Sequence, residues 1–569
     1  MRFGLFYEHQ LPRPHPEGAE EKLLLDALEQ VELADKLGLH SVWEVEHHFL
    51  EEYSHSSAPE VFLAAASQRT KNIRLGHGIV QLPPQYNHPA RVAERIATLD
   101  LISRGRVEFG TGESSSQAEL GGFQIDRALK RQQWEEALDV ATRLLVEEPF
   151  SGHHGRFVDM PPRNLVPKPK QKPHPPLWVA CSRRDTILLA ARKGIGALSF
   201  SFIEPEEARQ WVDEYYQLIQ SEECVPAGYA VNPNVAVVVP FMCHQDEETA
   251  IERGIDGAHF FGFSLAHYYV FGAHQPGQTN VWQEFERDRA QRGYARELVQ
   301  ATDAPLGVRL LQESIGSLRG AIGTPQQIRE LLERYEAAGV DEVIFVGQSG
   351  RNKHEHICES IELFAREVLP HFEAKRATKE AEKAERLAPA IERAMQRRPS
   401  PPPPPTDYTI LPDREPWQAT AHNGRNGHVP TEPRNLAQHA FAWLVNGRTD
   451  AQLDWIFGSA AGQGLIFRGM QRAFLPDRAA GVRGTVQYEV TGRRGTRHWV
   501  LRIADQRLVV EQAREPHPTV TFRVPAPLLA RMAAGQTTAG AAAMLGQLQI
   551  DGDLKLAGRL GEMLGRDPR

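Results

Sequence analysis

The sequence is poor in the features that mark secreted, metal-bound or membrane-spanning proteins. Its 569 residues include only four cysteines, and these show no pair spacing, so neither a disulfide framework nor a structural zinc site is expected. No apolar run reaches the roughly 18 residues that a membrane-spanning helix needs. The N-terminus also lacks a charged stretch followed by a long apolar segment. We therefore expect a cytoplasmic protein without bound metal and without a transmembrane segment.

Acidic residues outnumber basic ones over most of the chain. The formal net charge is -8, yet residues 430–569 carry 18 Lys and Arg against 12 Asp and Glu, so the remainder is strongly acidic. An acidic main body argues against nucleic acid as a partner, because phosphate backbones are bound by neutralising cations. The arginines of the basic segment are scattered among strand-like stretches. This pattern favours a solvated surface, with anionic lipid or a docking partner left open.

Strand-like and helix-like segments alternate about eight times in the first part of the chain. Such alternation predicts a closed parallel (β/α)8 TIM barrel of the α/β class rather than an open sheet. The aromatic- and Gly-rich piece 260–307 is too long for a plain connection and predicts an insertion over the barrel mouth. The predicted strands are 3–8, 41–46, 73–82, 106–110, 177–181, 196–202, 235–243 and 342–347.

A charged, Ala-rich helical pattern followed by a proline run marks the end of this part. Five prolines at 401–405 favour an extended, semi-rigid spacer. We therefore predict a barrel domain over 1–372, a charged helix and Pro-rich linker over 373–429, and a small α+β domain over 430–569. Within the last domain the predicted helices are 436–445, 451–457, 462–474, 525–534 and 554–564, and the predicted strands are 484–491, 497–504, 507–511 and 520–524.

One strand of the predicted barrel ends in an acid and two imidazoles. Glu46, His47 and His48 close the apolar run 41–45, and β/α barrels place their chemistry at the carboxyl ends of their strands. This arrangement favours an enzyme. Paired histidines at a strand end are also compatible with a buried structural hydrogen bond.

Eight short motifs follow one another along the same segment. They occupy residues 2–6, 42–49, 73–80, 88–91, 99–100, 105–110, 176–180 and 323–325. In this order they resemble the bacterial luciferase-like monooxygenase family, which consists of flavin-dependent β/α barrels. The resemblance implies an enzyme that takes reduced FMN from a separate flavin reductase and uses O2 to oxygenate a hydrophobic organic substrate.

The resemblance also implies roles for the three residues at the strand end. His47 would be the active-site base that moves protons around the reduced flavin, a task suited to an imidazole with an ordinary pKa of about 6.5. Glu46 would hold the tautomer of His47. His48 is the weaker candidate, because adjacent strand residues point to opposite faces.

The exit of the fourth predicted strand offers glycine-rich backbone to the flavin. Gly110, Thr111 and Gly112 lack the third glycine of a dinucleotide fingerprint, so they fit a loop that approaches the isoalloxazine closely. The chain departs from luciferase at Gly112 and Glu113, where luciferase has a reactive cysteine and an arginine. The missing arginine puts one phosphate contact in doubt.

The flavin platform is expected at Gly78 and Ile79. The family often has a non-prolyl cis peptide at this place. A trans glycine in a strand bulge is the alternative that the sequence leaves open.

A phosphate site is predicted where the fifth strand ends. Cys181, Ser182, Arg183 and Arg184 leave this strand and open a helix, whose free N–H groups would join a hydroxyl and two guanidiniums around a phosphate monoester. Two alternatives remain. Ser182 could merely cap the helix, and the segment 347–352 after the last strand competes because barrels often bind phosphate at their last loops.

The C-terminal part carries a second, softer set of motifs. Residues 484–492, Trp499 with Leu501, and 546–553 resemble the sterol carrier protein type 2 domain. The resemblance implies a five-stranded sheet covered by helices, with a tunnel for fatty acyl or sterol-like ligands. An apolar stripe in such a domain is also compatible with ordinary core.

Two other functions stay open at this point. One is a deazaflavin-dependent hydride-transfer oxidoreductase of the same family, although the Glu-His-His strand end leans toward FMN. The other is a lipid-binding or scaffold protein with a degenerate barrel. A homodimer is also left open.

Overall fold

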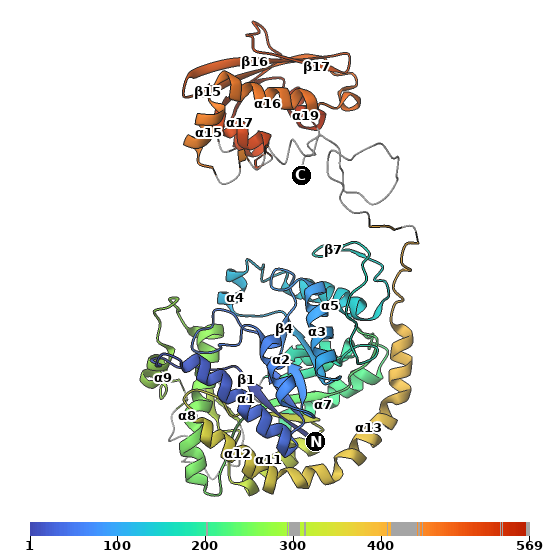
Figure 1. Cartoon of the computed structure of the whole chain (residues 1–569), viewed down its shortest axis with the longest axis vertical. Helices are drawn as coiled ribbons and strands as arrows, with labels where there is room; N and C mark the ends of the chain where they lie inside the picture. Colours follow the sequence, from blue (N-terminus) through green and yellow to red (C-terminus); the bar gives the residue numbers. More distant parts are fainter. Residues whose placement is uncertain are drawn as a thin grey trace. The chain divides into compact units, whose positions relative to one another are not determined.

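The structure is a computed structural model that divides into two compact units, Met1–Asp407 and Tyr408–Arg569. Figure 1 shows the course of the chain through both units. The residues that the structure describes are 1–200, 203–292, 294, 308–311, 314–406, 408–410, 441, 444–445, 448–534, 536–537, 539–544 and 546–564.

Eight parallel strands close the first unit into a barrel. Each strand pairs with the next one along the chain, and the last pairs with the first, so the described sheet has no open gap. The predicted closed barrel is therefore confirmed, and each predicted strand overlaps an observed one. The strands are β1 (Arg2–Tyr7), β2 (Ser41–Glu44), β3 (Arg74–His77), β5 (Val107–Gly112), β8 (Leu177–Cys181), β9 (Gly196–Ser199), β10 (Val235–Cys243) and β14 (Glu342–Val346).

Helices surround this barrel and begin where the sequence supplies start signals (Figure 1). Proline stands at the first turn of α2, α3, α7 and α11, where its missing N–H costs nothing. Thr324 and Gln327 also form a capping box at the start of α11. The helices are α1 (Ala19–Leu37), α2 (Pro59–Arg69), α3 (Pro89–Ile102), α5 (Lys130–Val146), α6 (Arg184–Arg192), α7 (Pro205–Gln220), α8 (Glu247–Ala266), α11 (Pro325–Ala337) and α12 (His354–Glu367).

Two tryptophans fill the interior of the barrel. The rings of Trp43 and Trp178 meet edge to face, with centroids 5.2 Å apart, and both side chains are almost completely buried. Each indole N–H donates to a buried carboxylate: Trp43 to Glu342 at 3.0 Å and Trp178 to Glu108 at 2.7 Å. A buried indole needs such a partner. These hydrogen bonds therefore fix the two rings, which fill the barrel interior below the carboxyl ends of the strands.

The insertion over the mouth begins later than predicted. Residues 260–266 are the end of α8, because their aromatic side chains are buried in helical spacing. A π-helix, η1 (His267–Phe271), and the short helix α9 (Val281–Asp288) follow. Residues 293 and 295–307 of the predicted insertion lie outside the described residues. The small elements of this unit are β4 (Val80–Gln81), α4 (Gln117–Gly122), β6 (His153–His154), β7 (Asp159–Met160), β11 (Val308–Leu311), β12 (Ser314–Leu318) and β13 (Ala321–Gly323).

A long helix, α13 (Leu369–Arg397), packs on the barrel unit, as Figure 1 shows. The side chains of Leu387 and Ala394 on this helix are fully buried. Residues 373–397, where the sequence predicts a charged helix, are thus helical, and this helix is packed because its apolar stripe finds a partner surface on α7. The predicted domain boundaries themselves stay a prediction.

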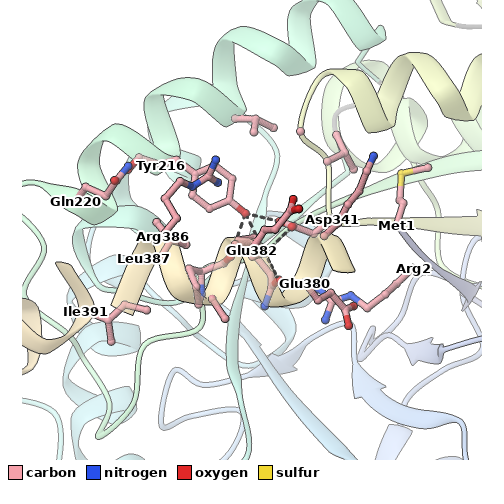
Figure 2. A pocket seen from close by; sticks show the side chains of 18 of the residues that line it. Met1, Arg2, Tyr216, Gln220, Asp341, Glu380, Glu382, Arg386, Leu387 and Ile391 are labelled. Atoms are coloured by element: carbon pink, nitrogen blue, oxygen red, sulfur yellow. Dashed lines mark hydrogen bonds and ion pairs between the residues drawn. The ribbon is translucent and has the colours of Figure 1, made fainter. Parts of the chain in front are cut away.

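A groove of about 1230 Å3 lies between part of α13 and the neighbouring barrel residues. Figure 2 shows Tyr216 and Asp341 in this groove, joined by a hydrogen bond. The Lys383 ammonium donates to Asn234 at 2.7 Å and to the Tyr216 hydroxyl at 3.1 Å, and it pairs with Asp341. Lys383 therefore ties α13 to the N-terminal end of the barrel.

The second unit consists of helices and one mixed sheet, in which some neighbouring strands are antiparallel and others parallel. The five strands lie in the order β17-β16-β15-β18-β19, which confirms the expected five-stranded sheet. Phe467 stacks on Trp499 in its core, with ring centroids 4.7 Å apart. The strands are β15 (Gly484–Gly492), β16 (Gly495–Ala504), β17 (Arg507–Glu511), β18 (Val520–Pro525) and β19 (Gln549–Gly552), and the helices are α15 (Asp450–Phe457), α16 (Ala460–Ala473), η3 (Pro476–Ala479), α17 (Ala526–Ala533), α18 (Ala539–Met544) and α19 (Leu554–Met563).

Three described elements of this unit, η3, α18 and β19, are not among those that the sequence predicts. Most of the predicted helix 436–445 lies outside the described residues. Across the described parts of both units, no helix combines the length and the apolar character that crossing a bilayer requires.

Replacing Lys383 with Met should destabilise the barrel unit by about 2 kcal/mol, because the Asp341 carboxylate would lose its partly buried cation. The free energy of unfolding in urea measures this loss. Lys379→Met is the matched control, since Lys379 lies on the same helix and pairs with Glu336 while its own side chain stays 48% exposed. That control should cost less than about 1 kcal/mol. Equal losses for both variants would contradict the anchoring role of Lys383.

Candidate active site

A pocket of about 710 Å3 lies at the carboxyl ends of the barrel strands. Its walls come from the segments that follow β1, β2, β3, β5, β8 and β9, from the start of α5, and from the end of α8 with η1. Its apolar lining includes Val45, Ile79, Val179, Phe200, Phe261 and Leu265. Polar groups gather in two places, one around His47 and one around Arg183. The two clusters give the pocket chemically different ends.

The first cluster holds the His47 imidazole between two carboxylates. Its Nδ1–H donates to Glu119 Oε1 at 3.0 Å, and its Nε2 lies 3.6 Å from Glu8 Oε2. The backbone N–H of His48 donates to the same Glu119 oxygen at 3.1 Å. On the far side of Glu8, the Tyr53 hydroxyl donates to Oε1 at 2.9 Å. His47 is 15% exposed, whereas Glu8 and Glu119 are buried.

These contacts set the charge of the cluster. Burial alone would lower the pKa of His47, but the Glu8 and Glu119 carboxylates outweigh it and raise that pKa to about 9. Burial raises the pKa of Glu8 to about 7, against the opposing effect of the His47 charge. Burial would also raise the pKa of Glu119, yet the His47 cation and its hydrogen bond lower it. At neutral pH His47 is therefore a cation and a proton donor, unlike the base with an ordinary pKa that the sequence suggests.

Glu46 does not hold His47, contrary to the expectation. Its carboxylate accepts from His48 Nε2 at 3.1 Å, from Asn87 at 2.8 Å and from the backbone N–H of Gln81 at 2.8 Å. His48 points away from the pocket and stacks on Tyr86. The alternation of side chains at the strand end thus separates His47 from the Glu46–His48 pair, and Glu119 takes the place expected for Glu46.

The second cluster is cationic and lies at the exits of β5 and β8. Lys130 and Arg131 at the start of α5 line the pocket together with Ser114 and Ser115. The Arg131 guanidinium donates twice to Glu113, at 2.8 and 3.0 Å. Two cations from the start of α5 therefore lie beside one acid here.

Of the four residues expected to bind phosphate after β8, two line the pocket. Ser182 and Arg183 are among its wall residues. Arg183 is the N-cap of α6 and makes no side-chain cap, so Ser182 does not cap the helix. Arg184 instead donates twice to Glu214, at 2.6 Å each. Cys181 is fully buried, where burial raises the pKa of its thiol, and it stays outside the pocket.

Tight packing accounts for two of the residues expected at the β5 exit. A Cβ at Gly110 would lie 1.9 Å from the His77 carbonyl oxygen, so glycine is required there by the neighbouring strand. Thr111 is buried and joins Trp178 to Trp134 through its hydroxyl. Only Gly112 of the three lines the pocket, and a Cβ there would meet Ile79 at 2.5 Å.

Gly78 and Ile79 both line the pocket. The peptide bond between them is trans, since each cis bond in the described residues precedes a proline. The backbone N–H of Gly78 donates to the Glu44 carbonyl at 2.6 Å, which fixes this segment against β2.

The competing phosphate loop, residues 347–352, is occupied by its own protein contacts. Gln10 and Gln348 exchange backbone and side-chain hydrogen bonds at 3.0 Å, and the Gly350 N–H donates to the Gln10 side chain at 2.9 Å. The Arg351 guanidinium covers Trp282 and donates to the Arg13 carbonyl. Gln348, Gly350 and Arg351 therefore already use these donors for contacts within the protein.

Sequence reasoning missed Glu8, Glu119, Lys130 and Arg131. Glu8 ends the first predicted strand, so a search for acids at every strand end would have found it. The other three lie on helices, where charged residues are ordinarily solvated. Nothing in their spacing distinguishes them from surface residues.

Comparison with known proteins places the two units. Residues 1–342 match the family model described as luciferase-like monooxygenase, and residues 467–565 match the SCP-2 sterol transfer family. The crystal structure of monooxygenase RslO1 from Streptomyces bottropensis is 26% identical with a TM-score of 0.51, over 65% of this chain and 100% of that one.

Characterised relatives point the same way. The oxygenase component of flavin-dependent trigonelline monooxygenase from Acinetobacter baylyi is 25% identical over 393 residues, or 65% of this chain and 96% of that protein. Limonene 1,2-monooxygenase from Rhodococcus erythropolis is 45% identical over 121 residues, or 21% of this chain and 30% of that protein. The chain spans about half the length of three other curated relatives that it matches.

Replacing Glu119 with Gln should lower the pKa of His47 from about 9 by roughly one to three units, because a close opposite charge is lost. Histidine titration by NMR measures this shift. Glu46→Gln is the matched control and should move the pKa of His47 much less, since Glu46 bonds to His48.

The same pairing makes stability depend on pH. His47 is held above its ordinary pKa of about 6.5, so its contribution to stability is complete below about pH 6.5 and is lost as the pH rises through about 9. Urea unfolding at a series of pH values measures this loss. A wild-type protein that gains stability over this window would contradict the charge assignment.

Proposed function

Because the chain belongs to the luciferase-like monooxygenase family, we propose that its barrel binds reduced FMN and uses O2 to oxygenate a hydrophobic organic substrate. The observation that carries this proposal is the two-ended pocket, which joins a cationic cluster to an imidazole–carboxylate cluster across apolar walls. Such a pocket suits a ligand with an anionic tail and a flat apolar body.

The residues present fit FMN. Lys130, Arg131, Ser182 and Arg183 would hold the phosphate, which needs cations, hydroxyls and free N–H groups. The trans segment of Gly78 and Ile79 would support the ring system. Deazaflavins carry the same ring shape with a longer acidic tail, so binding experiments have to include both cofactors.

When bound, reduced flavin supplies the electrons that activate O2. The chain's own residues hold and move protons beside it. His47 Nε2 carries a proton into the pocket, Glu119 keeps the opposite nitrogen protonated and the ring oriented, and Glu8 titrates near neutral pH. Apolar side chains around this cluster exclude water, which protects the reaction from side hydrolysis.

A separate flavin reductase is the proposed partner of the barrel. The relative from Acinetobacter baylyi is named as an oxygenase component, which supports a division of labour between reduction and oxygenation. The proposed C-terminal role is to bind an acyl or sterol-like molecule and supply it to the barrel, and the match of residues 467–565 to the SCP-2 sterol transfer family supports it.

Arg183→Ala should weaken FMN binding by about 1–2 kcal/mol, which is roughly a five- to thirtyfold rise in Kd, because one charge-assisted contact is lost. Arg184→Ala is the matched control and should leave the Kd unchanged, since Arg184 is paired with Glu214. Anaerobic titration with reduced FMN and with reduced deazaflavin measures both.

The same titration decides between the cofactors. Preference for deazaflavin would replace the monooxygenase proposal by hydride transfer, and binding of neither would favour a scaffold role. An equal loss for Arg184→Ala would move the phosphate away from the pocket.

Removing the second unit should affect large apolar substrates more than small ones. A protein ending at Thr406 should bind FMN like the full chain, yet its apparent KM should rise several-fold for long 2-alkanones and stay unchanged for short ones, because tethered delivery raises the effective concentration only of ligands that the second unit binds. Steady-state kinetics over a chain-length series measures this. An equal loss at every length would indicate a structural role instead.

A further inference from the structure

One oxygen of the Glu8 carboxylate, a residue of the pocket wall, accepts no hydrogen bond. The Tyr53 hydroxyl donates to Oε1 at 2.9 Å, whereas Oε2 is buried and has no hydrogen-bond partner among the described residues. The residue is only 3% exposed and lines the pocket wall. Because an unpaired buried carboxylate oxygen is costly, a donor from a bound molecule is the expected partner.

His47 presents a donor beside this acceptor. Its Nε2 lies 3.6 Å from Glu8 Oε2, which is too far for a hydrogen bond, while its Nδ1 is already engaged by Glu119. The two groups therefore face the same space without satisfying each other. A single atom that both accepts and donates would complete them.

We propose that Glu8 Oε2 and His47 Nε2 together bind a hydroxyl group on an otherwise apolar substrate. The hydroxyl oxygen accepts from His47, and its proton is donated to Glu8. The rest of the molecule contacts apolar lining residues such as Phe200, Phe261 and Leu265. This inference rests on the proposed function and narrows its substrate class to apolar alcohols or phenols.

The charges around the pair define the pH range in which it acts. The titratable groups that face Glu8 are His47, Tyr53, Glu119 and Tyr269. Because the pKa of Glu8 is about 7 and that of His47 about 9, the acceptor and the donor coexist between these values. Below about pH 7 a protonated Glu8 would donate, so the pair would then favour a carbonyl oxygen.

Three probes with one carbon skeleton test the proposal: limonene without oxygen, carveol with a hydroxyl and carvone with a ketone. Binding is measured by tryptophan fluorescence at about pH 8 and about pH 6, on either side of the Glu8 pKa, with and without saturating FMN. Wild-type protein at the higher pH should bind carveol roughly tenfold more tightly than limonene, the usual effect of one charge-assisted hydrogen bond. At the lower pH the advantage should pass to carvone.

Glu8→Leu should bring the carveol and limonene affinities within about twofold of each other while limonene binding persists, because the charge-assisted contact is gone. Glu8→Gln keeps the shape and cannot ionise, so its carveol preference at the higher pH should fall below the wild-type value, because an uncharged acceptor forms a weaker hydrogen bond. If Glu8→Leu fails to fold, the Glu8→Gln variant alone tests whether Glu8 binds the hydroxyl group. Glu46→Gln, which changes a buried carboxylate that bonds to His48 rather than lining the pocket, is the matched control and should keep the wild-type preference.

Three outcomes distinguish the role of Glu8, the preference for a hydroxyl group and the proposed cofactor. A wild-type carveol preference that survives in both Glu8 variants would overturn the role of Glu8, and no preference in wild type would overturn the hydroxyl itself. A wild-type protein that binds no FMN yet keeps the Glu8-dependent preference would refute the proposed cofactor and leave this inference standing.

Discussion

One imidazolium held between two buried carboxylates organises the active end of the barrel. Glu8 follows β1, His47 follows β2 and Glu119 lies on α4, so their contacts join three elements that are distant in sequence. A buried carboxylate without a partner is strongly unfavourable, and each acid here lies close to the shared cation. The same interaction therefore fixes the α4 segment on the pocket and sets the protonation of His47.

This cluster can stand at the mouth because the barrel beneath it is solid. Trp43 and Trp178 fill the interior and direct their indole N–H groups to Glu342 and Glu108. Such packing confines the cavity to the carboxyl ends of the strands. The large side chains in the interior thus keep the cavity at the rim of the barrel, where the acidic residues of the cluster lie.

Much of the fold follows from local sequence patterns, whereas the site depends on contacts that no local pattern records. The eight strands are apolar runs separated by amphipathic helices, so periodicity alone predicts them. Arg184 resembles a phosphate ligand until Glu214, thirty residues away, takes its guanidinium. Glu46 is the nearest acid to His47 in sequence, yet the alternation of side chains turns it toward His48. The acid that contacts His47 is Glu119, which lies on a helix seventy-two residues away. The sequence could therefore predict which strand end carries the candidate catalytic residues. It could not predict which carboxylate contacts His47 and keeps it protonated.

The opposite charges of the two pocket ends give the proposed chemistry a direction. The cations Lys130, Arg131 and Arg183 outweigh Glu113 at the β5 and β8 exits, while two carboxylates surround one cation at the other end. An anionic tail is attracted to the first end and repelled from the second. A phosphorylated cofactor would therefore enter in one orientation and leave the imidazole–carboxylate end to the substrate. The anionic tail of the cofactor would be repelled from the imidazole–carboxylate end. Proton transfer and substrate recognition would therefore share that end of the pocket.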